Sequence, residues 1–224
     1  MKPLCVAGID TGIGKTYVTG VLARALRARG EEAITAKLAQ TGCTGTSEDI
    51  LLHRRIMGVD ECPDDTAGET CPYVFPLPAS PHLAADAAGE EIETVRIAAC
   101  MDRLSRRYSR VLVEGVGGLC VPLTREILAI DFVAQQEWPV ILVTSGRLGS
   151  INHTILSMEA CAARGIDVAA LVYNAWGGDD ETITADSRAL FAERWAGVPV
   201  IDVPRFDLDL PPDICVERLA CRET

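Results

Sequence analysis

Gly8-Ile9-Asp10-Thr11-Gly12-Ile13-Gly14-Lys15-Thr16 follows the apolar run Leu4-Cys5-Val6-Ala7 at the start of the chain. It matches the spacing G-x-x-x-x-G-K-[ST], in which every fixed position has a mechanical role. The glycines let backbone N–H groups face a triphosphate, the lysine reaches the β- and γ-phosphates, and the threonine hydroxyl is a ligand for Mg²⁺. The apolar run before the loop and a helical apolar stripe after it predict a phosphate-binding loop between a strand and a helix.

Short β-rich runs alternate with helical stretches along most of the chain. Nearly continuous apolar strands, such as Val140-Ile-Leu-Val143, suit a parallel sheet that is buried on both faces. The expected strands are Leu4–Ile9, Ala33–Lys37, Val111–Glu114, Val140–Thr144, Val168–Tyr173 and Val200–Val203. This alternation implies parallel strands joined by right-handed crossovers. We therefore predict a single domain over residues 1–224 with an α/β fold, in which helices flank a doubly wound, mainly parallel sheet of the P-loop NTPase type.

One stretch breaks this alternation. Between Gly58 and Pro81 the chain has five prolines, which exclude a regular helix and a central strand. Loops of this length inside a compact domain are usually functional or disordered. Apolar members such as Tyr73 and Phe75 indicate that this stretch packs against the domain.

Composition and net charge argue against several classes of partner and indicate the cellular compartment. The net charge of −11 argues against nucleic-acid and anionic-membrane partners. No apolar run approaches the ~20 residues that span a bilayer. The nine cysteines are an odd number with no secretory signal before them, so we expect reduced thiols in the cytoplasm. Cys62 and Cys71 share the proline-rich stretch and stay open as candidates for oxidation or metal binding.

A strand that ends in a carboxylate is the second feature with chemical meaning. Arg110-Val-Leu-Val-Glu114 is followed by the turn Gly115-Val-Gly-Gly118. P-loop enzymes place an acid that orders the metal at such a strand end. The alternative is an ordinary surface carboxylate. The glycines permit close approach of an anion or a compact substrate.

Lys37 and Asp49 are weaker candidates when they are considered alone. A lysine at the end of a buried strand can add positive charge to a transferring phosphoryl group, but it can equally extend into solvent. Asp49 begins a helical run, where acids are common as caps. Asn174, at a strand end, either reads an adenine edge or caps a turn. His53 is expected on a solvated helix face, and the histidines do not predict a metal site.

Taken together, these residues resemble the dethiobiotin synthetase family, and the resemblance covers nearly the whole chain. The loop alone is unspecific, whereas the loop with V-E-G-x-G-G and L-G-x-I-N-H in this order is specific. The matching motifs are residues 8–16, Lys37 with Thr41-Gly42, Asp49, Pro72-Tyr73-x-Phe75, Ser80-Pro81-His82, Val113-Glu114-Gly-Val-Gly-Gly118, Pro122-Leu123, Pro139-Val-Ile-Leu-Val143, Leu148-Gly149-x-Ile-Asn152-His153 and Asn174.

The resemblance implies a cytoplasmic, homodimeric ligase of biotin biosynthesis, with its active site at the subunit interface. Such an enzyme uses ATP and Mg²⁺ to join CO2 to 7,8-diaminopelargonic acid, giving dethiobiotin, ADP and phosphate. The implied intermediates are a carbamate and then a carbamic-phosphoric anhydride.

The resemblance also assigns roles to residues of this chain. The implied metal ligands are Thr16, Asp49 and Glu114, and the implied catalytic residues are Lys15 and Lys37. The implied nucleotide-binding residues are Gly12, Ile13, Gly14, Lys15, Thr16, Tyr17, Asp49, Glu114, Gly115, Val116, Gly117, Asn174, Ala175, Pro204, Arg205 and Phe206. The implied substrate-binding residues are Thr11, Lys37, Thr41, Ser80, Pro81, Gly118, Leu148, Gly149 and Asn152.

Some positions depart from the family's pattern, and two other classes share the loop. Leu38, Ala175 and Arg205 stand where relatives often have proline, an acid and an aromatic, which leaves the preference among ATP, CTP and GTP open. A nucleotide switch of the Min and Par type would carry a lysine where this chain has Asp10. A ligase of the cobyrinic acid type needs a glutamine-hydrolysing domain, for which 224 residues leave no room unless a separate subunit supplies it.

Overall fold

The apolar runs form one sheet whose neighbouring strands are all parallel. The computed structural model describes residues 1–175, 180–204 and 212–220, and in these residues the strand order is β2-β5-β1-β6-β7-β8. The strands are β1 Leu4–Gly8, β2 Ala33–Lys37, β5 Arg110–Glu114, β6 Val140–Ser145, β7 Val168–Asn174 and β8 Val200–Val203. The predicted α/β fold is confirmed, and each predicted strand end lies within one residue of the observed end.

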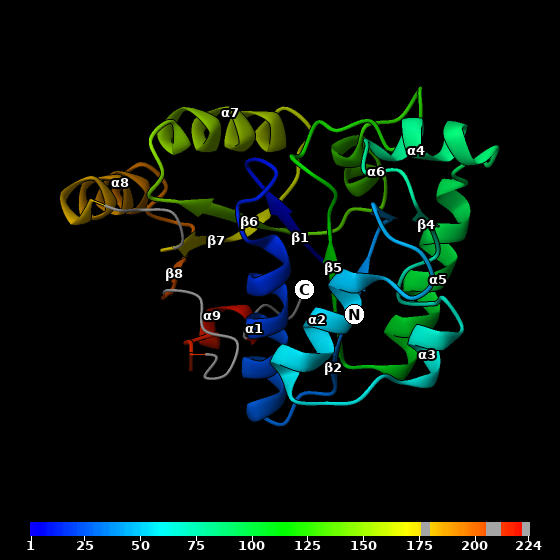
Figure 1. Cartoon of the computed structure of the whole chain (residues 1–224). Coiled ribbons are helices and arrows are strands. Elements are labelled where there is room, and N and C mark those ends of the chain that lie inside the picture. Colours follow the sequence, from blue (N-terminus) through cyan, green and yellow to red (C-terminus); the bar gives the residue numbers. More distant parts are fainter. Residues whose placement is uncertain (176–179, 205–211, 221–224) are drawn as a thin grey trace.

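Helices cover both faces of this sheet (Figure 1). Because right-handed crossovers fix the face of each connecting helix, α1 lies on one face and α6, α7 and α8 lie on the other. α2 packs along α1 and against β2. None of the described helices is both long and apolar enough to cross a membrane. The helices are α1 Lys15–Ala28, α2 Glu48–Met57, α3 Pro63–Thr66, α4 Pro81–Ala88, α5 Thr94–Arg107, α6 Ala129–Gln135, α7 Ser150–Ala162, α8 Glu181–Arg194 and α9 Glu217–Ala220.

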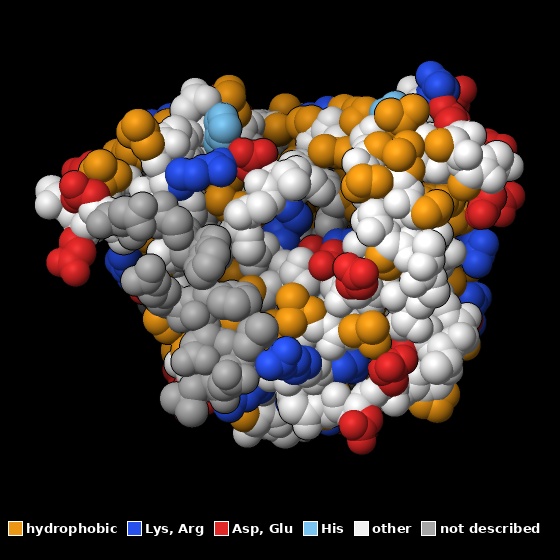
Figure 2. Space-filling model, in the orientation of Figure 1, with side chains coloured by type: hydrophobic (Ala, Val, Ile, Leu, Met, Phe, Trp, Pro, Cys, Tyr) orange, Lys and Arg blue, Asp and Glu red, His pale blue; other side chains and the backbone are white. Residues whose placement is uncertain are grey.

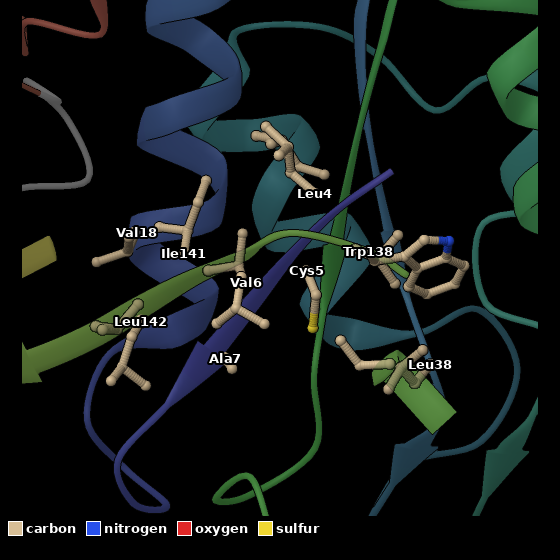
Figure 3. Close-up of a cluster of buried hydrophobic side chains, with 14 of the residues drawn as sticks. Leu4, Cys5, Val6, Ala7, Val18, Leu38, Trp138, Ile141 and Leu142 are labelled. Carbon is tan, nitrogen blue, oxygen red and sulfur yellow. The ribbon is translucent and has the colours of Figure 1, made fainter. Parts of the chain in front are cut away.

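The core is centred on β1 and β6, between the two helix layers (Figure 3). Val6, Val18, Ile141 and Leu142 are completely buried there. Burying one such aliphatic side chain stabilises the fold by about 1.5–3 kcal/mol. Since helices cover both faces of these strands, their sequences are continuous apolar runs instead of alternating patterns. This packing holds the end of β1, and therefore the loop that follows it, in a fixed place.

The proline-rich stretch packs against the domain and contains two short elements. Pro63 begins the single-turn helix α3, and β4 Val74–Phe75 pairs in parallel with β3 Gln40–Thr41 in a separate two-stranded sheet. The expectation of no regular helix was wrong for this one turn, because proline in a first turn removes no intrahelical hydrogen bond. The expectation of no central strand is confirmed, because β4 lies outside the main sheet.

A buried ion pair ties this stretch to α2 and β2. The Arg54 guanidinium donates from Nε and Nη2 to the Asp65 carboxylate at 2.9 and 2.8 Å, and from Nη1 to Thr35 Oγ1 at 2.7 Å. Thr70 Oγ1 donates to Asp65 Oδ1 at 2.8 Å. Burial alone would raise the pKa of Asp65, but these hydrogen bonds and the Arg54 charge lower it. The network therefore fixes α2, whose first turn begins beside Lys37.

Replacing Arg54 by methionine leaves the Asp65 carboxylate buried without its cation. We expect the free energy of unfolding at pH 7 to fall by about 3–5 kcal/mol, as for other buried pairs that lose one partner. Urea denaturation measures it. The double variant Arg54→Met/Asp65→Leu removes both charges and should recover part of the loss. A double variant less stable than Arg54→Met alone would contradict this account of the pair.

Candidate active site

The phosphate-binding loop connects β1 to α1, as the sequence predicts. Gly12 and Gly14 have φ values of +69° and +89°, in the left-handed region that glycine adopts at little cost. A Cβ at Gly14 would lie 2.3 Å from Asn174 Nδ2, so glycine is also required there for space. The N-cap residue of α1 is Gly14, which has no side chain to accept hydrogen bonds from the N–H groups of the first turn. These groups and the helix dipole form an anion site.

A cavity of about 380 Å³ opens over this loop. Its walls come from the carboxyl ends of parallel strands and from the first turns of α1 and α2, where ligands bind in doubly wound folds. Basic and acidic side chains lie next to each other in the hollow at the middle of this face (Figure 2). The lining residues are Thr11, Gly12, Gly14, Lys15, Thr16, Tyr17, Lys37, Asp49, Leu52, Glu114, Gly117 and Asn174.

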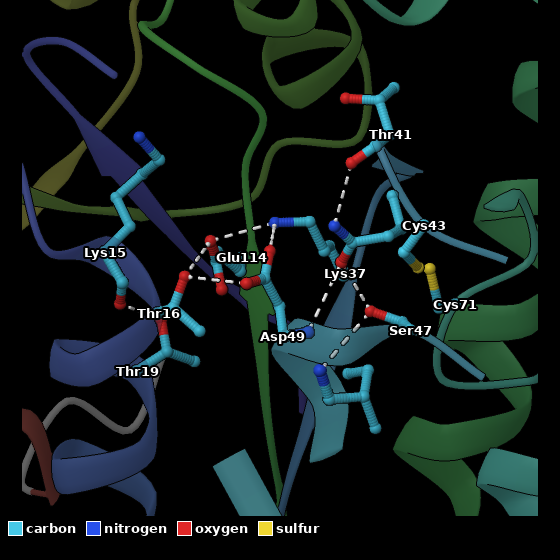
Figure 4. A network of polar contacts seen from close by, with 12 residues as sticks. Lys15, Thr16, Thr19, Lys37, Thr41, Cys43, Ser47, Asp49, Cys71 and Glu114 are labelled. Carbon is cyan, nitrogen blue, oxygen red and sulfur yellow. Dashed lines mark hydrogen bonds and ion pairs between the residues drawn. The ribbon is translucent and has the colours of Figure 1, made fainter. Parts of the chain in front are cut away.

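Four polar side chains of this cavity form one cluster (Figure 4). Thr16 Oγ1 lies 3.0 Å from Glu114 Oε1 and 3.2 Å from Asp49 Oδ1. Lys37 Nζ lies 2.9 Å from Glu114 Oε1 and forms a second ion pair with Asp49 Oδ2. One ammonium group thus contacts both carboxylates, and we call these four residues the polar cluster.

Within the polar cluster, Lys37 and Glu114 favour each other's charged form. Burial alone would lower the pKa of Lys37, but Glu114 and Asp49 outweigh it and hold that pKa above its ordinary value. Burial alone would raise the pKa of Glu114, but Lys37 and His53 hold it well below its usual range. Lys37 is therefore a fixed positive charge and not a proton acceptor at neutral pH.

Lys15 lies in the same cavity but has different partners. Its Nζ donates to the backbone oxygen of Asp10 at 2.9 Å. The pKa of this lysine is lowered to about 8, because burial, together with the nearby Lys37 charge, outweighs the pull of Glu114 and Asp49. A bound polyphosphate would raise this pKa, because an anion at short range favours the ammonium form.

Asn174, the last residue of β7, is completely buried and lines the cavity. Its Nδ2 donates to the backbone oxygen of Ile13 at 2.9 Å, so the amide supports the phosphate-binding loop directly. Two further predicted base contacts follow the strand ends, where Ala175 is half-buried and Pro204 is exposed. The other two, Arg205 and Phe206, lie outside the described residues.

The glycine turn after β5 faces two different surroundings. Gly117 lines the cavity with a φ of +51°, and a Cβ there would lie 3.3 Å from Thr11 Oγ1. Gly115, Val116 and Gly118 instead line a small space against β1. A Cβ at Gly115 or Gly118 would lie 3.6 Å or more from the nearest backbone atoms, an ordinary contact distance, so space alone does not require glycine at these two positions.

Most residues predicted to bind the substrate do not line the 380 Å³ cavity. Leu148 is 88% exposed, and Gly149 caps α7 with a φ of +91°. Ser80 is the N-cap residue of α4, and its side chain makes no capping hydrogen bond. Those that do not line it are Thr41, Ser80, Pro81, Gly118, Leu148, Gly149 and Asn152. Their substrate contacts stay a prediction.

Two residues without a predicted role contact the polar cluster. His53 is completely buried, and its Nε2 lies 2.9 Å from Glu114 Oε2. The expectation of a solvated His53 was wrong, because α2 turns this face toward β5. The available signal was spacing, since His53 comes one helical turn after Asp49. Gln40 Oε1 accepts from Ser47 Oγ at 2.7 Å and from Asp49 N at 3.4 Å, which fixes the first turn of α2.

Comparisons with known proteins decide the family. A family model described as an AAA domain matches residues 2–203. The ATP-dependent dethiobiotin synthetase BioD of Chlorobaculum tepidum is 51% identical over 214 residues, which are 93% of this chain and 90% of that protein. This chain belongs to the ATP-dependent dethiobiotin synthetase family. The BioD 2 protein of Pasteurella multocida is 46% identical over 187 residues, 84% of this chain and 88% of that protein.

Solved structures of other proteins have the same fold as this member of the dethiobiotin synthetase family. A cell division ATPase MinD of Pyrococcus furiosus is 22% identical with a TM-score of 0.56, covering 91% of this chain and 84% of that one. A ParA family ATPase of Chlorobium tepidum is 14% identical with a TM-score of 0.56, covering 92% and 85%. At these identities the likeness shows the P-loop fold alone. The close relatives are ATP-dependent ligases of biotin biosynthesis, which does not favour the switch alternative.

The pKa of Lys15 gives a test of phosphate binding that does not depend on turnover. Below pH 8 this lysine is charged with or without ATP, whereas above pH 8 binding must first restore its proton. We therefore expect ATP affinity to fall above pH 8. ATP binding should take up about 0.1 proton at pH 7 and more than about 0.5 at pH 8.5. Calorimetry in buffers of different ionisation heat measures this uptake, and equal uptake at both pH values would exclude Lys15 as its source.

Proposed function

We propose that this chain carboxylates 7,8-diaminopelargonic acid and closes the ring to give dethiobiotin, with ATP converted to ADP and phosphate. The observation that carries the proposal is the single cavity in which Lys15, Lys37 and two carboxylates surround the phosphate-binding loop. Family membership supports the substrate and the biosynthetic role. The local gathering of ammonium groups supports phosphate binding despite the net charge of −11.

The polar cluster suits Mg²⁺ as the metal of this reaction. Its donors are one hydroxyl, from Thr16, and two carboxylates, from Asp49 and Glu114, which meet within 3.2 Å of the hydroxyl oxygen. Mg²⁺ prefers oxygen ligands and usually takes one or two carboxylates together with substrate phosphates and water. When bound, it would neutralise charge on the nucleotide phosphates.

The proposed reaction begins with a neutral amine that adds to CO2 and loses a proton to water, which gives a carbamate anion. Lys37 stays protonated because of its carboxylate partners, so it presents positive charge to the cavity throughout. Two ammonium groups near the amine favour the carbamate and disfavour a protonated amine. The cavity thus selects the nucleophilic form by electrostatics.

The carbamate oxygen then attacks the γ-phosphorus as the bond to ADP breaks. The N–H groups of the loop, Lys15 and Lys37 stabilise the charge on the transferring group. The second amine attacks the carbonyl carbon of the anhydride, the bond from that carbon to the phosphate oxygen breaks, and the departing phosphate takes up the proton of the amine as the ring closes. Because no enzyme side chain forms a covalent intermediate, catalysis depends on positioning, which can supply about 7–11 kcal/mol.

Phosphate release with and without the diamine and bicarbonate tests the reaction class. We expect release only when both are present with ATP and Mg²⁺, because phosphate leaves only when the second amine attacks. Phosphate release is measured on the same preparation with both the diamine and bicarbonate, with either one alone and with neither. Mass spectrometry identifies dethiobiotin as the product. Phosphate release at the same rate without the diamine would contradict the proposal and indicate an ATPase.

Replacing Lys37 by alanine tests its proposed catalytic role. Turnover should fall by about 10²–10³, as when other preorganised charge-stabilising donors are removed. ATP binding should stay measurable, because the loop and Lys15 still hold the phosphates. Lys2→Ala is the matched control, since Lys2 is an exposed lysine paired with Glu137. Near-normal turnover of Lys37→Ala would overturn the role assigned to this residue.

A further inference from the structure

His53 has no part in the reaction described so far, yet it is completely buried against the site. Its Nε2 lies 2.9 Å from Glu114 Oε2. Its Nδ1 is buried and has no hydrogen-bond partner among the residues that the structure describes. A buried polar atom without a partner costs free energy. An apolar side chain would avoid that cost, so the contact with Glu114 is the feature that distinguishes histidine here.

This contact fixes how the Glu114 carboxylate is turned. A carboxylate only accepts hydrogen bonds, so His53 Nε2 carries the hydrogen and donates it to Oε2. The other oxygen, Oε1, lies 2.9 Å from Lys37 Nζ and 3.0 Å from Thr16 Oγ1. With both oxygens held, the carboxylate cannot rotate about its last bond without losing contacts on both sides.

One helix brings two groups to the polar cluster. Asp49 and His53 are one helical turn apart and therefore share a face of α2. Asp49 contacts Thr16 and Lys37, while His53 contacts Glu114 from the side opposite to these two. Because Gln40 fixes the start of α2, the position of this helix sets both carboxylates together.

We propose that His53 is a positioning residue, which donates to Glu114 Oε2 and so keeps Oε1 turned toward Thr16 and Lys37, where the metal-bound phosphates of the nucleotide are expected. This inference rests on the proposed function and deepens it. Removal of such an outer partner of a metal ligand typically lowers metal affinity or activity 10- to 100-fold. Loss of the His53 hydrogen bond should therefore weaken the Mg²⁺-dependent part of nucleotide binding.

Three variants of the full chain separate positioning from packing. His53→Gln keeps an amide N–H at about the reach of Nε2, His53→Asn carries the same amide one carbon shorter, and His53→Leu has no donor. For each, calorimetry gives ATP affinity with Mg²⁺ and with EDTA, and steady-state rates give the Mg²⁺ concentration for half-maximal phosphate release.

For His53→Asn and His53→Leu we expect the gain in ATP affinity on adding Mg²⁺ to shrink about 10- to 100-fold. Their affinity in EDTA should stay unchanged, because the loop and Lys15 are untouched. His53→Gln should retain most of the gain. The Mg²⁺ requirement for phosphate release should rise in the same order.

Two outcomes would overturn the inference. One is a wild-type Mg²⁺ gain in His53→Asn or His53→Leu, and the other is a His53→Gln variant as impaired as His53→Asn. For each variant, the ATP affinity with Mg²⁺ is compared with the ATP affinity in EDTA, and the thermal unfolding midpoint is measured as well. A general loss of stability would lower both affinities and is therefore distinguished from a loss of the Mg²⁺ gain alone. If His53→Leu does not fold, the comparison of His53→Gln with His53→Asn tests the inference. A wild-type protein that binds Mg-ATP but does not carboxylate the diamine would refute the proposed function and leave this binding test intact.

Discussion

The parallel register between β2 and β5 is the constraint on which the site depends. It places Lys37 directly opposite Glu114 at the carboxyl end of the sheet. A slip of one residue would turn one of these side chains to the other face and separate the pair. Two carboxylates at 4 Å repel each other by about 4 kcal/mol at an effective dielectric constant of 20. Lys37, which contacts both Asp49 and Glu114, offsets this repulsion and lets them lie beside Thr16.

The rest of the structure holds this arrangement in place. The buried core around β1 and β6 fixes the phosphate-binding loop, and Asn174 supports the loop from the end of β7. On the other side, Gln40 and the Arg54–Asp65 pair fix α2, which carries Asp49. The groups that line the cavity therefore lie on packed strands and helices or on the short loops that join them.

Much of this was predictable from the sequence, for identifiable physical reasons. Strands buried on both faces leave continuous apolar runs, so the main sheet and the end residues Lys37, Glu114 and Asn174 followed from pattern alone. The loop was predictable because each of its fixed positions has one chemical role. The family followed from the order of the motifs, and the curated relatives confirm it.

The parts that could not be predicted depend on tertiary contacts. The burial of His53 follows from how α2 packs on α1 and β2, and a helix with two arginines beside this histidine looks solvated in sequence. Gln40 acts through Ser47 and the backbone of Asp49, contacts that no local pattern encodes. β3 and β4 have two residues each, too few for any periodicity.

The most direct measurement is a crystal structure with a non-hydrolysable ATP analogue, Mg²⁺ and the diamine. The account predicts Mg²⁺ bound by Thr16, Asp49 and Glu114, with the ammonium groups of Lys15 and Lys37 both in contact with the γ-phosphate. A metal held by other residues, or a γ-phosphate beyond the reach of Lys37, would contradict it.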